Sequence, residues 1–174
     1  MNRIDQLFQS KRNVLSIYVT AGFPEVNDTM RIVTHLASAG VDLIEIGMPF
    51  SDPLADGETI QHSSRIALKN GITVARILDQ VKIIRQTISI PIVLMGYYNQ
   101  VLRYGDERFF RDAKDAGADG VILPDLPVAV FQEKYMALLL DLDLKMPFLI
   151  TPQTTTERIR LIDSVSTGFL YIVA

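Results

Sequence analysis

The 174-residue sequence contains no cysteine. This absence excludes disulfides, thiolate metal sites and a cysteine nucleophile, and it is consistent with a reducing cytosol. Histidine is scarce as well, because only His35 and His62 are present. Both fall in segments with helical periodicity, where a histidine is usually a surface or packing residue. We therefore expect neither a histidine-based metal site nor a histidine-based catalytic triad.

The sequence also lacks an excess of positive charge and any long hydrophobic run. Seventeen Lys and Arg residues stand against 20 Asp and Glu residues, for a net charge of -3. This balance gives no indication of a nucleic-acid partner or of an acidic membrane surface. No stretch approaches the length of a membrane span, and the N-terminus has no apolar signal core. We expect a cytoplasmic, globular protein.

Short apolar runs alternate with longer segments of helical periodicity. Strand-like runs lie at 14–20, 42–46, 91–95, 121–123, 147–150 and 168–173. Helical patterns are expected at 2–10, 27–39, 58–69, 73–86, 106–116, 129–141 and 155–164. Strands that are apolar nearly throughout and alternate with helices predict a parallel sheet covered by helices.

Two architectures fit this alternation, an open doubly wound sheet and a (β/α)8 TIM barrel. The sequence has neither a Gly-x-Gly-x-x-Gly turn after the first strand nor a Gly-x-x-x-x-Gly-Lys loop, which weakens the case for a nucleotide-binding open sheet. We therefore favour the barrel, as a single domain over residues 1–174. A complete barrel needs about 250 residues. We expect about six of the eight βα units here, and a natural protein that is longer.

One stretch, residues 43–57 (LIEIGMPFSDPLADG), departs from the apolar pattern. Glu45 lies inside a strand, where a lone carboxylate is costly unless it is used or neutralised. Strand alternation places Glu45 on the same face as Leu43. The neighbouring strand interiors contain no Lys or Arg to pair with it. We interpret Glu45 as an acid/base group near the carboxyl ends of the strands, rather than as a structural ion-pair residue.

Three further carboxylates, Asp52, Asp56 and Asp125, follow strand ends. Each lies beside a proline or a glycine or in a proline-flanked turn, where an aspartate is more often a turn residue than a catalytic one. Glu45, Asp56 and Asp125 nevertheless fall together on the predicted active-site face. A lysine that forms a Schiff base is not expected, because Lys145 precedes its strand and so lies at the opposite end.

Five motifs resemble those of the tryptophan synthase alpha chain family, and the acidic loop among them is highly specific. They are 18–24 (YVTAGFP), 45–57 (EIGMPFSDPLADG), 95–99 (MGYYN), 124–127 (PDLP) and 150–152 (ITP). The resemblance implies a (β/α)8 barrel with an extra N-terminal helix and an extra helix after the second strand. It also implies a lyase of tryptophan biosynthesis that cleaves indole-3-glycerol phosphate to indole and glyceraldehyde 3-phosphate, with no cofactor or metal.

The resemblance further implies roles for single residues. Glu45 would be the acid/base group, and Asp56 would hold the indole N–H and stabilise positive charge on the ring. Tyr171 would also hydrogen-bond Glu45. The indole pocket would be walled by Tyr18, Met95, Tyr97, Ile122, Ile150 and Tyr171.

The family's partner is a beta chain that carries pyridoxal phosphate (PLP) and receives indole through a tunnel, in an α2β2 assembly. By the resemblance, the loop at Pro49 and Asp52 would dock on that chain, with Asp52 a contact or loop-closure residue. The sequence departs from the family at 128–131 (VAVF), where acidic residues are usual, and it has no counterpart of the family's phosphate site. We therefore expect little lyase activity from these residues alone. The alternative function is a docking subunit that activates the beta chain.

Overall fold

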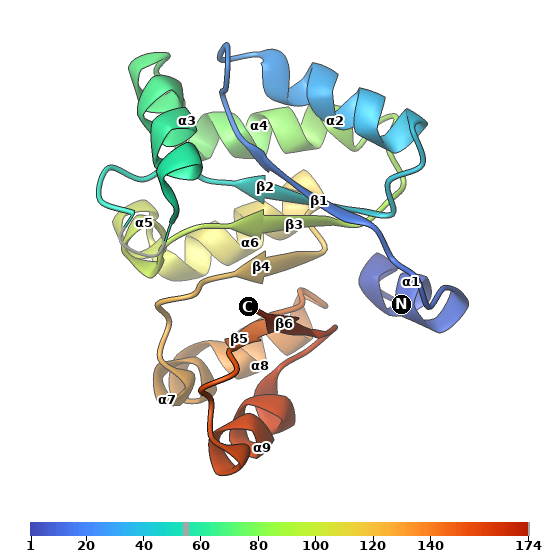
Figure 1. Cartoon of the computed structure of the whole chain (residues 1–174), viewed down its shortest axis with the longest axis vertical. Helices are drawn as coiled ribbons and strands as arrows, with labels where there is room; N and C mark the ends of the chain where they lie inside the picture. The colour runs from blue at the N-terminus through green and yellow to red at the C-terminus, as the bar shows by residue number, and fades with distance from the viewer. Residues whose placement is uncertain (54–55, 174) are drawn as a thin grey trace.

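Short apolar runs form six strands in the part of the chain that the computed structural model describes, residues 1–53 and 56–173. The strands are β1 (Ser16–Thr20), β2 (Leu43–Gly47), β3 (Ile92–Met95), β4 (Gly120–Ile122), β5 (Phe148–Ile150) and β6 (Leu170–Ile172). β1 to β4 form one parallel sheet in chain order, and β5 and β6 form a second (Figure 1). An isolated parallel bridge between Gly120 and Lys145 links the two sheets.

Helices supply the crossovers that parallel strands require. They are α1 (Arg3–Ser10), α2 (Asp28–Ser38), α3 (Glu58–Lys69), α4 (Val74–Ile84), α5 (Tyr98–Tyr104), α6 (Asp106–Ala116), α7 (Val128–Val130), the π-helix η1 (Phe131–Tyr135), α8 (Met136–Asp141) and α9 (Thr156–Val165). Two helices, α3 and α4, separate β2 from β3 (Figure 1). This confirms the two helices that were predicted at 58–69 and 73–86.

Helix boundaries follow local capping chemistry. The side chain of Thr73 accepts a hydrogen bond from the backbone N–H of Arg76 at the start of α4, and Thr155 does the same for Arg158 in α9. Each such cap satisfies a backbone donor that the helix leaves unpaired. Gly117 ends α6 with a φ of 96°, a left-handed conformation that glycine adopts without steric cost.

Successive strand residues point to opposite faces, and this alternation builds two hydrophobic clusters. The outer cluster lies between the sheets and the helices, and its strand residues include Ile44, Ile46, Ile92, Leu94 and Val121. The inner cluster lies on the other face and consists of Ile4, Leu43, Val93 and Ile122. Full burial of one such side chain stabilises the fold by about 1.5–3 kcal/mol.

Helix α1 packs against the inner cluster near the amino ends of the strands (Figure 1). Ile4 is completely buried there. Asn2 caps α1 by accepting a hydrogen bond from Ile4 N–H, and its amide donates to the carbonyl oxygens of Asp119 and Asp143 at 2.9 and 2.8 Å. These contacts anchor the N-terminal helix and leave the carboxyl ends of the strands available for a site.

Asp119 is the centre of a charged network at the same end. Its carboxylate forms ion pairs of 2.9 Å with both Arg3 and Arg85 and accepts a hydrogen bond from Ile92 N–H. Burial lowers the pKa of the Arg85 guanidinium, and the charge of Asp119 opposes that effect. The network therefore ties α1 and α4 to the start of β3 and β4.

Two features depart from the sequence-based prediction. Helix α5 was not predicted. Its start is fixed by Gln100 within its first turn, which accepts a hydrogen bond from Tyr97 N–H, and by the distant carboxylate of Asp125, which accepts one from Tyr98 N–H at 2.8 Å. The helix predicted at 129–141 is interrupted by η1. Within η1, the hydroxyl of Tyr135 donates to Asp106 and lies 2.6 Å from the Tyr98 hydroxyl.

None of the helices formed by the described residues has the length and apolar character to span a bilayer.

Candidate active site

Glu45 lies in the middle of β2 and faces the inner side, as strand alternation predicted. It is 4% exposed. Its Oε1 accepts a hydrogen bond from the Ser16 hydroxyl at 2.5 Å, and its Oε2 accepts one from the Tyr171 hydroxyl at 3.2 Å, which confirms the expected contact with Tyr171. Both of these donors are neutral hydroxyls. A carboxylate held in this way is oriented without a cation that would fix its charge.

Tyr18 connects the two carboxylates of the site. It pairs with Glu45 in the register of β1 and β2. Burial raises the pKa of its phenol to about 12; a hydrogen bond with Thr20 opposes this rise, and the charges of Asp56 and Glu45 add to it. Tyr18 therefore stays protonated at neutral pH. It lies close enough to both carboxylates for their negative charges to raise its pKa.

Gly47 makes the placement of Tyr18 possible. A Cβ at Gly47 would overlap the phenol ring and hydroxyl of Tyr18. The absence of a side chain at the end of β2 therefore lets the ring lie across that strand.

Asp56 lies in the loop between β2 and α3 and is half-buried. Burial raises the pKa of its carboxyl group, and a hydrogen bond from the Tyr97 side chain opposes the rise. The ring of Tyr97 also stacks on Phe50, with ring centroids 5.1 Å apart. Tyr97 therefore holds the loop from both ends, through Phe50 near its start and Asp56 near α3.

The predicted apolar walls divide between the two faces. Met95 and Tyr171 are partly buried and pack against the inner cluster, and Ile122 belongs to that cluster and is fully buried. Ile150 packs instead against the outer cluster. Leu149 pairs with Tyr171 and packs against the inner cluster, so alternation in β5 gives the inner face to Leu149 rather than to Ile150.

The residues weighed as less probable participants make structural contacts or lie at the surface. Asp125 is exposed and caps α5, whose first residue is 27 positions earlier in the chain, rather than bonding within its own turn. Lys145 forms ion pairs with Asp5 at 2.7 Å and Asp143 at 3.3 Å near the start of β5. His35 and His62 are exposed on α2 and α3. Within residues 1–53 and 56–173, no group of three or more His, Asp or Glu side chains is arranged to hold a metal ion.

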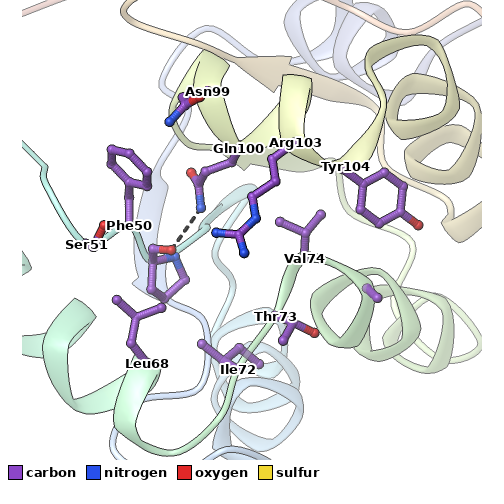
Figure 2. Close-up of a pocket in the computed structure, with 12 residues that line it drawn as sticks. Phe50, Ser51, Leu68, Ile72, Thr73, Val74, Asn99, Gln100, Arg103 and Tyr104 are labelled. Atoms are coloured by element: carbon purple, nitrogen blue, oxygen red, sulfur yellow. Dashed lines mark hydrogen bonds between the residues drawn. The ribbon is translucent and has the colours of Figure 1, made fainter.

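The two loop residues predicted to meet a partner differ in exposure. Pro49 is buried, and its carbonyl accepts a hydrogen bond from the Gln100 side chain at 2.8 Å. Asp52 is exposed and accepts a hydrogen bond from the Ser51 hydroxyl at 2.6 Å. The loop borders a cavity of about 500 Å³ between α3, α4 and α5 (Figure 2). Arg103 is among the polar residues that line it.

Sequence reasoning missed three residues of the site. Ser16 and Thr20 alternate with Tyr18 along β1, so the period of two would have placed all three on the inner face. Gln100 binds the backbone N–H of Tyr97 at 2.9 Å, but its position could not be read without α5.

The fold and site define a class, the (β/α)8 barrel domains whose active sites lie at the carboxyl ends of the strands. A family model described as "Tryptophan synthase alpha chain" matches residues 4–174. The chain belongs to the tryptophan synthase alpha chain family.

Individual relatives agree with this assignment. The tryptophan synthase alpha chains of Flavobacterium psychrophilum and Christiangramia forsetii are 53% and 54% identical to the chain over 174 residues, which is 100% of this chain and 69% and 68% of those relatives. The structure of tryptophan synthase subunit alpha from Legionella pneumophila str. Paris has a TM-score of 0.94 and 36% identity, over 100% of this chain and 68% of that chain. Tryptophan synthase from M. tuberculosis in its aminoacrylate-bound form has a TM-score of 0.94 and 34% identity, over 100% of this chain and 72% of that chain. These similarities confirm the predicted fold class.

Proposed function

We propose that the chain is the alpha subunit lyase of tryptophan synthase, which cleaves indole-3-glycerol phosphate to indole and glyceraldehyde 3-phosphate. The observation that carries the proposal is the position of Glu45: a buried carboxylate on the inner face, held by two hydroxyl groups, in a site that also contains Asp56. Both residues also lie within the acidic motif of the family.

Glu45 performs the proton transfers. In the proposed reaction it delivers a proton to carbon 3 of the indole ring and takes the proton of the glycerol hydroxyl next to that carbon. The bond between the ring and the glycerol chain then breaks, its electron pair returns to the ring, and the hydroxyl carbon becomes the aldehyde. Protons and electrons balance within the substrate and Glu45, so the step needs no cofactor and no metal. PLP belongs to the partner beta chain.

Asp56 stabilises the charge that this step creates. Protonation of carbon 3 makes the indole ring cationic, and a carboxylate on the ring N–H favours that state. The hydrogen bond from Tyr97 holds the Asp56 carboxylate in its loop. Tyr18, Met95, Ile122 and Tyr171 supply the walls for the flat ring, together with Tyr97; the outer packing of Ile150 offers less support for such a role.

The proposed partner is a tryptophan synthase beta chain in an α2β2 heterotetramer. One similar structure is a tryptophan synthase complex from Pyrococcus furiosus, with a TM-score of 0.88. Asp52 is exposed and presents its carboxylate beside Ser51, so a partner can reach it directly. Pro49 is buried, and its carbonyl is held by the side chain of Gln100, so it supports the loop and is not exposed to a partner. A subunit that only activates the beta chain is the second candidate, and the exposure of Asp52 is the observation that favours it.

Replacing Glu45 with Gln separates the two candidates. We expect the native protein that carries Glu45→Gln to lose indole release by at least about 100-fold, because general acid–base catalysis contributes that much or more. Stimulation of a beta chain should remain. The matched control is Glu133→Gln, at an exposed position on η1. Full indole release by Glu45→Gln would contradict the lyase assignment of this residue.

A further inference from the structure

Gln100, in the first turn of α5, joins the two loops that carry the proposed site. Its Oε1 accepts a hydrogen bond from Tyr97 N–H at 2.9 Å, and its Nε2 donates to the carbonyl of Pro49 at 2.8 Å. Figure 2 shows the second of these bonds at the edge of the cavity. Tyr97 begins the turn after β3, and Pro49 begins the loop that leads to Asp56. One side chain therefore holds both loops where the strands end.

Gly96 provides the space for this arrangement. A Cβ at Gly96 would lie 2.7 Å from Oε1 of Gln100 and 2.6 Å from Cε of Met48. Nonbonded atoms rest about 3.5–4.0 Å apart. A side chain at this position would push the amide away from Tyr97 N–H, so the bare backbone of Gly96 is part of how Gln100 is placed.

The groups that Gln100 holds are the ones that fix Asp56. Phe50 directly follows Pro49, and its ring stacks on Tyr97 at 5.1 Å. The Tyr97 side chain hydrogen-bonds Asp56 and works against the effect of burial on the pKa of that carboxyl group. If the backbone of Tyr97 or the start of the loop shifts, both contacts change together.

We propose that Gln100 is a positioning residue that sets the contact between Tyr97 and Asp56 and thereby the affinity of the site for the indole ring. Gln100 acts through Tyr97 and Pro49 and takes no part in proton transfer. The inference rests on the proposed function, because indole is the ligand that Asp56 is proposed to hold.

Indole binding is the first test. Gln100→Leu removes both hydrogen bonds and keeps a good helix former in α5, whereas Gln100→Glu keeps the acceptor for Tyr97 N–H and loses the donor to Pro49 at neutral pH. The chain contains no tryptophan, so the fluorescence of added indole reports binding directly. We expect the dissociation constant to rise about five- to tenfold in Gln100→Leu and less in Gln100→Glu. The control Gln132→Leu, at an exposed position, should bind as the parent does.

The pKa of the Asp56 carboxyl group, followed by carbon NMR, is the second test. Gln100→Leu should raise it, because a weaker hydrogen bond from Tyr97 favours the charged form less. In a Tyr97→Phe background the same substitution should add no further rise. If Gln100→Leu raised the Asp56 pKa by loosening the fold in general, it would raise that pKa in the Tyr97→Phe background as well. Comparing the two backgrounds therefore isolates the positioning role.

The outcomes separate this inference from the proposed function. If Asp56→Asn weakens indole binding and Gln100→Leu changes neither indole affinity nor the Asp56 pKa, the positioning role of Gln100 is wrong and the proposed function stands. If Asp56→Asn leaves indole affinity unchanged, the anchor role of Asp56 is wrong, and the Asp56 pKa alone decides whether Gln100 sets the contact with Tyr97. Where Gln100→Leu does not fold, Gln100→Glu provides the same two measurements.

Discussion

Tyr18 shows how much of this site depends on single residues rather than on the sheet as a whole. Its register with Glu45 and its closeness to Asp56 place one phenol beside both carboxylates. The sequence predicted Tyr18 as a pocket wall, but the requirement for glycine at position 47 is visible only when the two strands are side by side. Strand alternation can be read from consecutive residues, whereas a contact between two strands joins residues that are far apart in the sequence.

Gly47→Ala tests that requirement. The added methyl group would overlap the phenol, so we expect the ring of Tyr18 to move outward and the protein to lose about 1–3 kcal/mol of unfolding free energy. As the phenol gains water, its pKa should fall from about 12 toward the ordinary value of 10.0. NMR titration of the tyrosine ring signals measures this. Gly57→Ala adds the same methyl group in open space and should leave the Tyr18 titration as it is.

At the scale of elements, α5 escaped prediction, and part of what fixes its start is far away in the sequence. Asp125 reaches Tyr98 N–H from the loop after β4, 27 residues away in the chain. Asp125 was interpreted as a residue of its own turn, and the structure shows instead that it fixes the start of a helix distant in the sequence. Helices α3, α6 and α9, whose apolar periodicity is local, were predicted within a residue or two of their observed bounds.

Asp125→Ala should destabilise α5 without removing a catalytic group. Loss of a helix cap costs about 0.5–2 kcal/mol. We expect faster amide hydrogen exchange in α5 and a correspondingly lower unfolding free energy. Asp163→Ala, at an exposed position on α9, is the control and should leave α5 exchange unchanged. Unaltered exchange in α5 of Asp125→Ala would show that the cap is unnecessary.

The hydrogen bond from Tyr135 to Asp106 joins η1 to the start of α6. This bond lowers the pKa of the Asp106 carboxyl group below its ordinary value of 3.8. A carboxyl group whose pKa is lower in the folded state stabilises the fold above its unfolded pKa and loses that contribution as the pH falls through the folded value. The hydrogen bond from the Tyr135 hydroxyl therefore contributes most to the free energy of unfolding at neutral pH.

Tyr135→Phe should cost about 1 kcal/mol at neutral pH, because it removes the hydrogen-bond donor from a partly buried pair. The loss relative to the parent should shrink as the pH falls below 3.8, where the parent also loses this contribution. Urea unfolding at neutral and acidic pH measures both values. The more exposed pair of Tyr104 and Asp112 provides the control, and Tyr104→Phe should have a smaller effect.

At the scale of the whole molecule, the two faces of the sheets have different roles. The outer face packs on helices, and the inner face is closed by α1 at one end and carries Glu45 toward the other. Strand alternation predicted that Glu45 shares a face with Leu43, and the structure shows that this face is the inner one. The apolar runs did not predict that Ile150 would pack outward, because β5 is a run of apolar residues in which either phase is plausible.

Asp119 holds this arrangement together at the amino ends of the strands. Asp119→Asn should leave the Arg85 guanidinium buried without its counter-charge, and breaking a buried ion pair on one side costs about 3–5 kcal/mol. We expect a large fall in unfolding free energy together with detachment of α1, visible as faster exchange of its amides. Asp112→Asn, which alters an exposed ion pair with Arg108, is the control and should cost far less.

The bond between Tyr171 and Glu45 has a consequence for how the site comes into being. Its partners are 126 residues apart in the chain and belong to different sheets. While the protein is being synthesised, Glu45 emerges from the ribosome long before its second hydroxyl donor. Without β6 in place, the Glu45 carboxylate lacks the hydrogen bond from Tyr171. Glu45 therefore has both of its hydroxyl donors only when the two sheets lie together, so the geometry of the acid/base group depends on the docking of one sheet on the other.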